Sequence, residues 1–536
     1  MIFSSVRSHV ATVTQRIMVA AIALLMTACA TTTGSDPFAR SIRPVIVDGL
    51  DISFMGAVIE RGFEEIIDRA LYEPGVDDLF SGALDELEKI DKSLSFEIAD
   101  GRIFINIDGN AVHDLGEIPK DDVTKWSQTM IKAVLSARRQ SELFKQASDE
   151  DFYRAMFEGA VSKLDRFSRY ADQNHAARNR LLRDGIIGLG MRVVQTHNGA
   201  LVEALIKNGP AATAGVMLND IIIAADKVLL AGRSLPDINR RLEGHAKGPV
   251  NLTVRRSGEA GDIIIKAQRD LIVPDTVTSQ VVDGIAEVQI ASFNQRTAQA
   301  VEKALIEAIS ESDSELKGLI LDLRGDPGGL LDQAIKIADL FLEQGSIAEL
   351  RGRHPGANQS YKAGRGDILD GLPMVIIVDG RAASAAEILA AALQDNHRAV
   401  VVGTVTLGKG SVQTIIRLPN NGEIALTWSR VAAPSGVGLH GLGILPDICL
   451  SGEASPAGAV ISHLFVTPNP MVAARPQWLN PPRGSDEEVT SLRSECPAET
   501  RTNIALDLEV ARRIVSDPAL LSVAAPDHGA QLAVTP

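Results

Sequence analysis

The sequence predicts an α/β layered core that follows a mainly helical block and a glycine-rich block of short strands. Apolar residues recur at helical spacing through much of residues 46–184. Short apolar runs alternate with glycine-rich turns over residues 185–272. Strands and helices then alternate over residues 273–455, which is the pattern of a sheet covered by helices.

The composition is typical of a multidomain globular protein. The chain has 536 residues, room for several domains of about 100–200 residues each. Apolar residues make up 45% and charged residues 23%, which is ordinary for folded domains. The formal net charge is −15 and no basic stripe is present. Because phosphate binding needs positive patches, this charge argues against a nucleic-acid partner.

The N-terminus predicts export. Arg7 and Arg16 precede the apolar run Ile17–Met26, which is too short to span a bilayer but suits a signal peptide. The run leads into Thr27-Ala28-Cys29, which resembles a bacterial lipobox with Cys29 as the lipidated residue, although Met26 replaces the usual Leu. The alternative is a plain cleaved signal followed by an incidental cysteine.

The lipobox resemblance implies a protein on the periplasmic side of a bacterial cell envelope, held to the membrane by its N-terminal lipid. We expect a signal peptide over residues 1–28 and a tether over residues 29–45. Ala30 stands where Asp would mark inner-membrane retention, so the pattern favours the outer membrane.

The helical block, residues 46–184, shows no catalytic constellation, and we expect a cap, substrate-handling or self-association domain. Its predicted elements are helices over Ile59–Leu71, Val123–Leu143 and Phe152–Leu164, and a hairpin that joins Ser95–Ile98 to Ile103–Ile107 through Asp100-Gly101.

The later blocks have their own predicted elements. In the core, residues 273–455, we expect strands over Ile285–Ile290, Gly318–Leu323, Met374–Val378 and Ala399–Val402, and helices over Thr297–Ile309, Leu331–Phe341 and Ala385–Leu393. Residues 456–536 form a C-terminal extension, proline-rich at first, with a helix over Ile504–Val515.

The block of residues 185–272 carries a peptide-binding pattern. Gly188-Leu189-Gly190-Met191 resembles the carboxylate-binding loop of PDZ domains, in which backbone N–H groups converge on a peptide carboxylate. Gly209–Val216 and Asn219–Ile222 resemble a second PDZ stretch, and Leu235–Leu242 is the expected groove helix. The resemblance implies binding of apolar C-terminal tails, with a degenerate domain of structural or autoinhibitory role as the alternative.

Three core segments carry residues suited to acyl transfer. Leu321–Leu331 runs from a strand through Pro-Gly-Gly into a helix, a turn whose free N–H groups suit an oxyanion. Val378–Ile388 places Ser384 before a helix of small residues. Gly403–Gln413 places Lys409 between two glycines.

In order, spacing and local sequence these segments resemble the carboxy-terminal processing peptidases, also called tail-specific proteases. The likeness covers residues 165–450 and includes Asp165–Tyr170 and Gly441–Asp447. Asp326, where the family usually has Asn, and Arg166, where it has Pro, are departures.

The resemblance implies a Ser/Lys dyad with Ser384 as the nucleophile and Lys409 as the general base. It implies that Gln413 orients the lysine and that the N–H groups of Gly328 and Ala385 form the oxyanion hole. We expect burial to lower the pKa of Lys409, because a lysine of ordinary pKa is almost always charged at neutral pH.

The resemblance also implies a fold and a set of partners. The expected fold is an α/β catalytic core of ClpP/crotonase-like layered β-β-α type, with an inserted PDZ β-barrel-like domain and a mainly helical N-terminal domain. Substrates would be proteins or peptides with apolar C-termini, and no cofactor or metal is expected. An adaptor lipoprotein and a homo-oligomer are further partners that the sequence leaves open.

Other interpretations are weaker. Gly403–Lys409 matches part of a phosphate-binding loop, but Gly410 stands where Ser or Thr should hold magnesium and a hairpin around Asn421-Gly422 follows. His397 or His440 could join Ser384 in a triad, but no G-x-S-x-G elbow surrounds the serine. A catalytically silent PDZ scaffold and an acyl-CoA enzyme of the crotonase type are the remaining alternatives.

The two cysteines outside the lipobox, Cys449 and Cys496, leave two possibilities open. They could pair in an oxidising compartment and tie the C-terminal extension to the core, or remain as buried free thiols.

Overall fold

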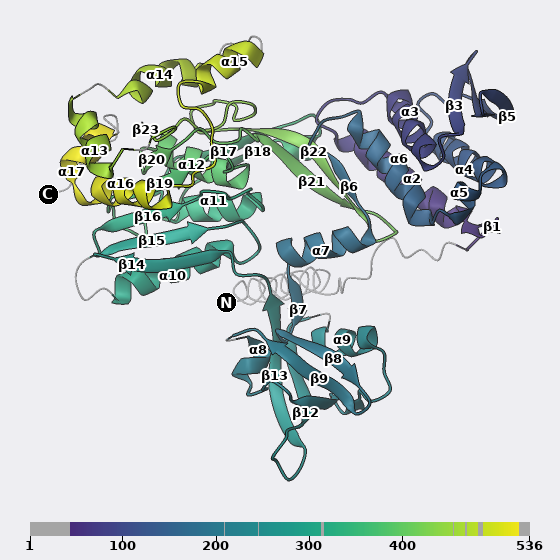
Figure 1. Ribbon diagram of the computed structural model, residues 1–536, viewed down its shortest axis with the longest axis horizontal. Coiled ribbons are helices and arrows are strands. Elements are labelled where there is room, and N and C mark those ends of the chain that lie inside the picture. Colours follow the sequence, from purple (N-terminus) through teal and green to yellow (C-terminus); the bar gives the residue numbers. More distant parts are fainter. Residues whose placement is uncertain are drawn as a thin grey trace, which may run out of the picture.

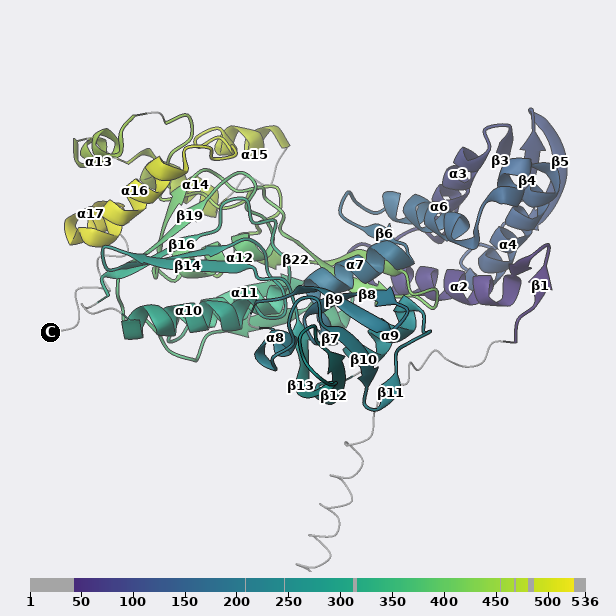
Figure 2. The same cartoon turned by 60° about the horizontal axis from the view of Figure 1, so that its bottom comes forward.

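The computed structural model describes residues 43–524 except 208, 245, 312–315, 454, 467–468 and 481–485. The N-terminal helices lie at one end, the core lies at the other, and a small β-rich domain projects between them (Figure 1). Turning the molecule brings this domain forward, below the helix α7 (Figure 2). The predicted signal peptide and Cys29 lie outside the described residues, and the predicted domain boundaries stay predictions.

The N-terminal part packs helices against a small antiparallel sheet of order β3-β4-β5. Its elements are β1 (Ile46–Val47), β2 (Leu50–Asp51), α2 (Ile52–Arg69), α3 (Val76–Leu87), η1 (Glu88–Ile90), β3 (Leu94–Ala99), β4 (Arg102–Ile107), β5 (Asn110–Glu117), α4 (Val123–Gln140), α5 (Glu142–Gln146) and α6 (Asp149–Ser162). Aromatic stacking organises its core, since the Phe80 ring lies 4.0 Å from Phe63 and 4.7 Å from Trp126.

The β-rich domain is an antiparallel sheet of order β7-β13-β12-β10-β9-β8, with β11 paired to β10. Its elements are β7 (Ile186–Gly188), β8 (Met191–Thr196), β9 (Gly199–Leu205), α8 (Pro210–Thr213), β10 (Ile221–Ala225), β11 (Val228–Leu229), α9 (Leu235–Glu243), β12 (Gly248–Arg255) and β13 (Ile263–Ile272). The first and last strands pair with each other, from Gly188 with Asp270 to Ile186 with Ile272, so the chain enters and leaves at one neck.

The core is built on a six-stranded sheet of order β14-β15-β16-β19-β20-β23, parallel except for the edge strand β14. These strands are β14 (Val277–Val282), β15 (Ile285–Ile290), β16 (Gly318–Asp322), β19 (Met374–Val378), β20 (Val400–Gly403) and β23 (Ile448–Cys449). The central strands are buried on both faces, which agrees with their continuous apolar sequence.

Helices cover both faces of this sheet. One face packs on α10 (Thr297–Glu311), α11 (Leu331–Asp339) and α12 (Ala385–Asp395). The other face packs on α13 (Ala457–Val466), α16 (Ile504–Ser516) and α17 (Pro518–Ala524) of the C-terminal extension. The extension therefore completes the core, and it also contains α14 (Pro470–Leu479) and α15 (Asp486–Arg493).

A second sheet, of order β18-β17-β22-β21 with β6 paired to β22, joins the core to the N-terminal part. Its strands are β6 (Arg169–Ala171), β17 (Ser346–Arg351), β18 (Gln359–Lys362), β21 (Ser411–Arg417) and β22 (Glu423–Ala432), with η2 (Pro355–Ala357) before β18. The β21–β22 hairpin reaches into the N-terminal core, where Ile416, Leu418, Ile424 and Leu426 are buried. The loop that carries Lys409 leads directly into this hairpin, not into a helix as a phosphate-binding loop requires.

Cys449 and Cys496 form a disulfide, which resolves the choice that the sequence left open. The bond joins the last strand of the core sheet to the extension just after α15. None of the helices in the described ranges is both long and apolar enough to cross a membrane.

Candidate active site

Ser384 lies at a strained turn between β19 and α12. Its backbone angles, φ 56° and ψ −113°, fall in a region that non-glycine residues rarely adopt. Such strain costs about 1–3 kcal/mol and persists only where the surroundings enforce it. Here the Asp379 carboxylate accepts N–H groups from Arg381 and Ala382 in the same turn and from Gly325 in the neighbouring one.

The Pro-Gly-Gly turn lies directly against the serine. A Cβ on Gly328 would lie 2.8 Å from Ser384 Cβ and 2.9 Å from the Ala385 backbone nitrogen. Gly328 also has a φ of 90°, so glycine is required both for space and for conformation. The two residues predicted to supply oxyanion N–H groups, Gly328 and Ala385, are therefore neighbours beside the predicted nucleophile.

The Gly328 N–H group has a partner that the sequence did not predict. It donates to Asp326 Oδ1 at 2.7 Å. Asp326 is fully buried, and burial raises the pKa of its carboxyl to about 8, opposed only by this hydrogen bond.

Lys409 is half-buried on a tight loop that follows β20. Gly410 packs so closely on the next segment that a Cβ would lie 2.2 Å from the His440 nitrogen. The Lys409 Nζ lies 5.5 Å from the centroid of the Phe167 ring. Burial lowers the pKa of Lys409, as expected, and the charge of Arg169 lowers it further, while Glu387 and Asp165 oppose the shift.

Glu387 joins the serine turn to the lysine loop. Its fully buried carboxylate accepts the backbone N–H groups of Ser384 at 2.8 Å, Gly408 at 2.7 Å and Lys409 at 2.9 Å, and the Thr406 hydroxyl. Burial raises the pKa of Glu387 above its ordinary value, and the four hydrogen bonds oppose this rise. This residue was missed from sequence, although the Ser-x-x-Glu spacing is that of a helix capping box.

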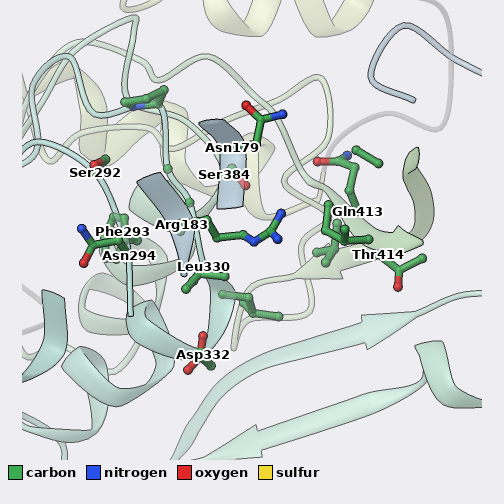
Figure 3. A pocket seen from close by; sticks show the side chains of 18 of the residues that line it. Asn179, Arg183, Ser292, Phe293, Asn294, Leu330, Asp332, Ser384, Gln413 and Thr414 are labelled. Carbon is green, nitrogen blue, oxygen red and sulfur yellow. The ribbon is translucent and has the colours of Figure 1, made fainter. Parts of the chain in front are cut away.

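A single cavity of about 730 Å³ contains the predicted catalytic groups. Its walls include Ser384, Lys409, Gln413, Gly328 and Ala385. Figure 3 shows Ser384 and Gln413 among the side chains that line it.

The amide nitrogen of Gln413 donates to the hydroxyls of Ser411 at 3.1 Å and Thr427 at 3.3 Å. Its predicted role in orienting Lys409 stays a prediction. Among the described residues no cluster of His, Cys, Asp and Glu side chains is placed to hold a metal ion.

The cavity has an additional wall that the sequence did not predict. The helix α7 (Gln173–Arg183) contributes Asn179, Leu182 and Arg183. Arg183 points into the cavity in Figure 3 and forms ion pairs with Asp184 and with the buried Glu423 of β22. The helix α7 precedes the β-rich domain and Pro274 follows it. The two segments that connect this domain to the rest of the protein therefore both border the cavity.

The β-rich domain has a groove of its own, of about 280 Å³. The predicted loop Gly188–Met191 lines it together with Asn239, Leu242 and Glu243 of α9. Burial raises the pKa of the Glu243 carboxyl.

Comparison with known proteins identifies two regions of this chain. The profile of peptidase family S41 matches residues 284–450, and that of the PDZ domain matches residues 201–256. A carboxy-terminal-processing protease of Bartonella bacilliformis is 38% identical over 302 residues, which are 56% of this chain and 70% of that protein.

Two further similarities extend this comparison. The carboxy-terminal processing protease CtpA of Bacillus subtilis is 32% identical over 313 residues, 58% of this chain and 66% of that protein. Among solved structures, the photosystem II D1 C-terminal processing protease is 24% identical, with a TM-score of 0.35. The superposition covers 61% of this chain and 93% of that protease's chain.

Proposed function

We propose that this chain, which belongs to peptidase family S41 and contains a PDZ domain, is a serine endopeptidase with a Ser/Lys dyad. Family S41 is the family of the carboxy-terminal processing proteases. The observation that carries the proposal is the cavity whose walls include Ser384, Lys409, Gly328 and Ala385. Its substrates are exported proteins or peptides with apolar C-terminal tails.

In this mechanism the Ser384 hydroxyl attacks the scissile carbonyl while Lys409 accepts its proton. The oxyanion is held by the N–H groups of Ala385, at the start of α12, and of Gly328. Lys409 then gives the proton to the leaving amine, and water releases the acyl-enzyme with the lysine again as base.

The lysine must be neutral to act as a base. At its ordinary pKa only about one lysine in 2,500 is neutral at pH 7. The half-buried position of Lys409 and the nearby positive charge of Arg169 both lower its pKa, so they increase the neutral fraction.

The PDZ domain selects and delivers the substrate tail. The groove beside Gly188–Met191 is lined by Leu189, Met191 and Leu242, which suit an apolar C-terminal residue. Both segments that connect the PDZ domain to the core border the catalytic cavity. Tail binding therefore shifts the population toward an arrangement in which Ser384 and Lys409 are aligned.

The cellular setting is also part of the proposal. The Cys449–Cys496 disulfide supports an oxidising compartment, consistent with a lipid anchor at Cys29 on the periplasmic side of the envelope, preferentially at the outer membrane. We also propose that the core has ClpP/crotonase-like layering and that the N-terminal domain is mainly helical. An adaptor lipoprotein is a further proposed partner, and self-association of the chain is a further proposed interaction.

The test is mass spectrometry of an unstructured substrate with an apolar C-terminus, incubated with the protein lacking residues 1–29. We expect cleavage by the natural protein and none by Ser384→Ala or Lys409→Ala. Ser435→Ala and Lys303→Ala, in exposed positions outside the cavity, are matched controls that should cut normally.

Each other outcome has a distinct meaning. Equal cleavage by the natural protein and both active-site variants would refute the dyad. Tail-peptide binding without cleavage at any substrate concentration would favour a catalytically silent PDZ scaffold.

A further inference from the structure

Asp326 is a buried acid beside the predicted oxyanion hole, and one of its two carboxyl oxygens has no hydrogen-bond partner among the described residues. The side chain is 0% exposed. Its Oδ1 accepts the Gly328 N–H at 2.7 Å, whereas Oδ2 has no hydrogen-bond partner in the described part of the chain. A buried carboxylate with an unpaired oxygen is costly, whereas a protonated carboxyl group is less so.

The turn that contains Asp326 touches the serine turn at several points. The Asp326 carbonyl accepts the Ala383 N–H at 3.0 Å, one residue before Ser384. Gly328, two residues further on, lies against Ser384 and Ala385. A change in the charge or position of Asp326 therefore acts directly on the groups that would stabilise the oxyanion.

Several charged groups lie on the elements that surround Asp326. They are Arg324 on the same turn, Asp379 and Arg381 on the serine turn, Glu387 on α12 and Lys409 on its loop. Arg324 forms ion pairs with Asp322 and Asp507. Asp379 and Glu387 accept backbone N–H groups. Arg381 is mostly exposed and lies 3.8 Å from Asp379. The Lys409 Nζ lies over the Phe167 ring. Burial is accordingly the cause that raises the pKa of Asp326 to about 8.

The two charge states of Asp326 have different effects on Gly328. A neutral carboxyl accepts the Gly328 N–H as the amide oxygen of an asparagine would, which leaves that N–H able to share its proton with an oxyanion. An ionised carboxylate forms a charge-assisted bond about twice as strong and places a negative charge beside the developing oxyanion.

We propose that Asp326 is a positioning residue that supports catalysis only while uncharged, and that its ionisation withdraws the Gly328 N–H from the oxyanion and silences the enzyme. This inference rests on the proposed function, because it assumes Ser384 as the nucleophile. It gives the protease an alkaline limit that an asparagine at this position would not impose.

The test is the pH dependence of kcat/KM for the natural protein, Asp326→Asn and the control Asp370→Asn, an exposed loop residue. For the natural protein and the control we expect kcat/KM to rise with pH as Lys409 loses its proton. It should then fall by about tenfold per pH unit once Asp326 is ionised. Asp326→Asn should keep the rise and lose the fall. An unchanged alkaline fall in Asp326→Asn would overturn the proposal.

Thermal unfolding provides a second readout that does not depend on activity. A carboxyl with a raised folded-state pKa binds an extra proton in the native state between its ordinary pKa and the raised one, so stability falls as pH rises through that window. The Tm of Asp326→Asn relative to the natural protein should therefore increase from pH 5 to pH 8 and then level off. A difference independent of pH would show that Asp326 is ionised throughout and would overturn the proposal.

The two measurements separate this inference from the proposed function. If no cleavage depends on Ser384 at any pH, the proposed function is wrong, and the catalytic role of Asp326 is wrong with it. If cleavage depends on Ser384 but neither readout distinguishes Asp326→Asn from the control, only the inference is wrong.

Discussion

Glu387 links the backbone of Ser384 to that of Lys409, because its carboxylate accepts an N–H group from each. In Glu387→Gln one oxygen becomes an NH₂ group, which would point at N–H donors instead of accepting from them. We expect kcat to fall about 100-fold with little change in KM, the size of effect that a small displacement of reacting groups produces. Steady-state kinetics on the substrate used above measures both constants.

The matched control for this prediction is Glu349→Gln, a partly exposed glutamate on β17. It should retain natural kinetics. Glu387→Gln should still unfold cooperatively, so that the kinetic loss is not a loss of fold. A variant with natural kcat would show that the two backbone segments are held by other contacts, and Glu387 would then have no positioning role.

The sequence predicted Ser384 and Lys409 as the dyad, which stays a prediction, and it did not indicate the residues that contact their backbones. Ser384 and Lys409 stand in short motifs, and both line one cavity. Glu387 also stands in a motif, but a Ser-x-x-Glu pattern predicts only a helix cap and not a contact with a loop 21 residues away. The partnership of Asp326 with the Gly328 N–H likewise depends on the conformation of one turn, which composition does not determine.

Several core elements with strongly apolar sequences were predicted nearly to the residue, whereas α2 begins at Ile52 and not at the predicted Ile59. The strands β15 and β19 have the predicted bounds, and α12 begins at the predicted Ala385 and runs two residues longer. The edge strand β5 and the polar helix α7 lack such a pattern and were missed. The helix α3 was also missed, although its apolar residues recur at helical spacing. The packing of α16 on the core sheet was also not foreseen, because a surface helix and a layer of the core have similar amphipathic patterns.

The C-terminal extension supports the lysine loop through α15. Arg493 at the end of this helix donates to the carbonyls of Thr406, at 2.9 Å, and Leu442, on the two segments that surround Lys409. Three residues later Cys496 is bonded to Cys449 at the end of the core sheet. The disulfide thus fixes the position from which Arg493 reaches the loop that contains Lys409.

Loss of this disulfide should therefore affect both stability and activity. The bond closes a loop with a sequence separation of 47, for which chain entropy gives a contribution of up to about 4 kcal/mol to the free energy of unfolding. We expect the Cys449→Ser/Cys496→Ser double variant to unfold at a lower temperature and to lose several-fold in kcat.

The reducing agent TCEP supplies the control for the disulfide prediction. It should lower the Tm of the natural protein toward that of the double variant and leave the variant itself unchanged. Equal Tm values for the natural protein and the double variant without reductant would show that the bond contributes nothing to the fold.

At the scale of the whole molecule, the N-terminal part, the C-terminal extension and the PDZ neck each contact the cavity lined by Ser384 or the loop that contains Lys409. The N-terminal part holds the β21–β22 hairpin that continues from the Lys409 loop. The C-terminal extension holds the same loop through Arg493. The PDZ neck borders the cavity through α7, where Arg183 is paired with Glu423 of the hairpin and its carbonyl accepts the Gln295 N–H. Packed elements therefore connect the PDZ neck to the cavity lined by Ser384 and Lys409.

The architecture of the neck allows this coupling to be tested by removing the PDZ domain. A Cβ on Gly185 would lie 2.3 Å from Val273 Cγ1, so residues 185 and 273 can be joined by a short glycine linker in place of residues 186–272. If the domain restrains the dyad until a tail binds, the shortened protein should cut substrates with free and amidated C-termini at similar rates. The natural protein should prefer the free acid by about tenfold or more, since tail binding must shift its population.

Ile264→Glu, on the exposed side of β13, is the control that should keep this preference. A shortened protein that still requires a free, apolar C-terminus would show that tail recognition resides in the catalytic cavity, because the PDZ groove would be absent from it.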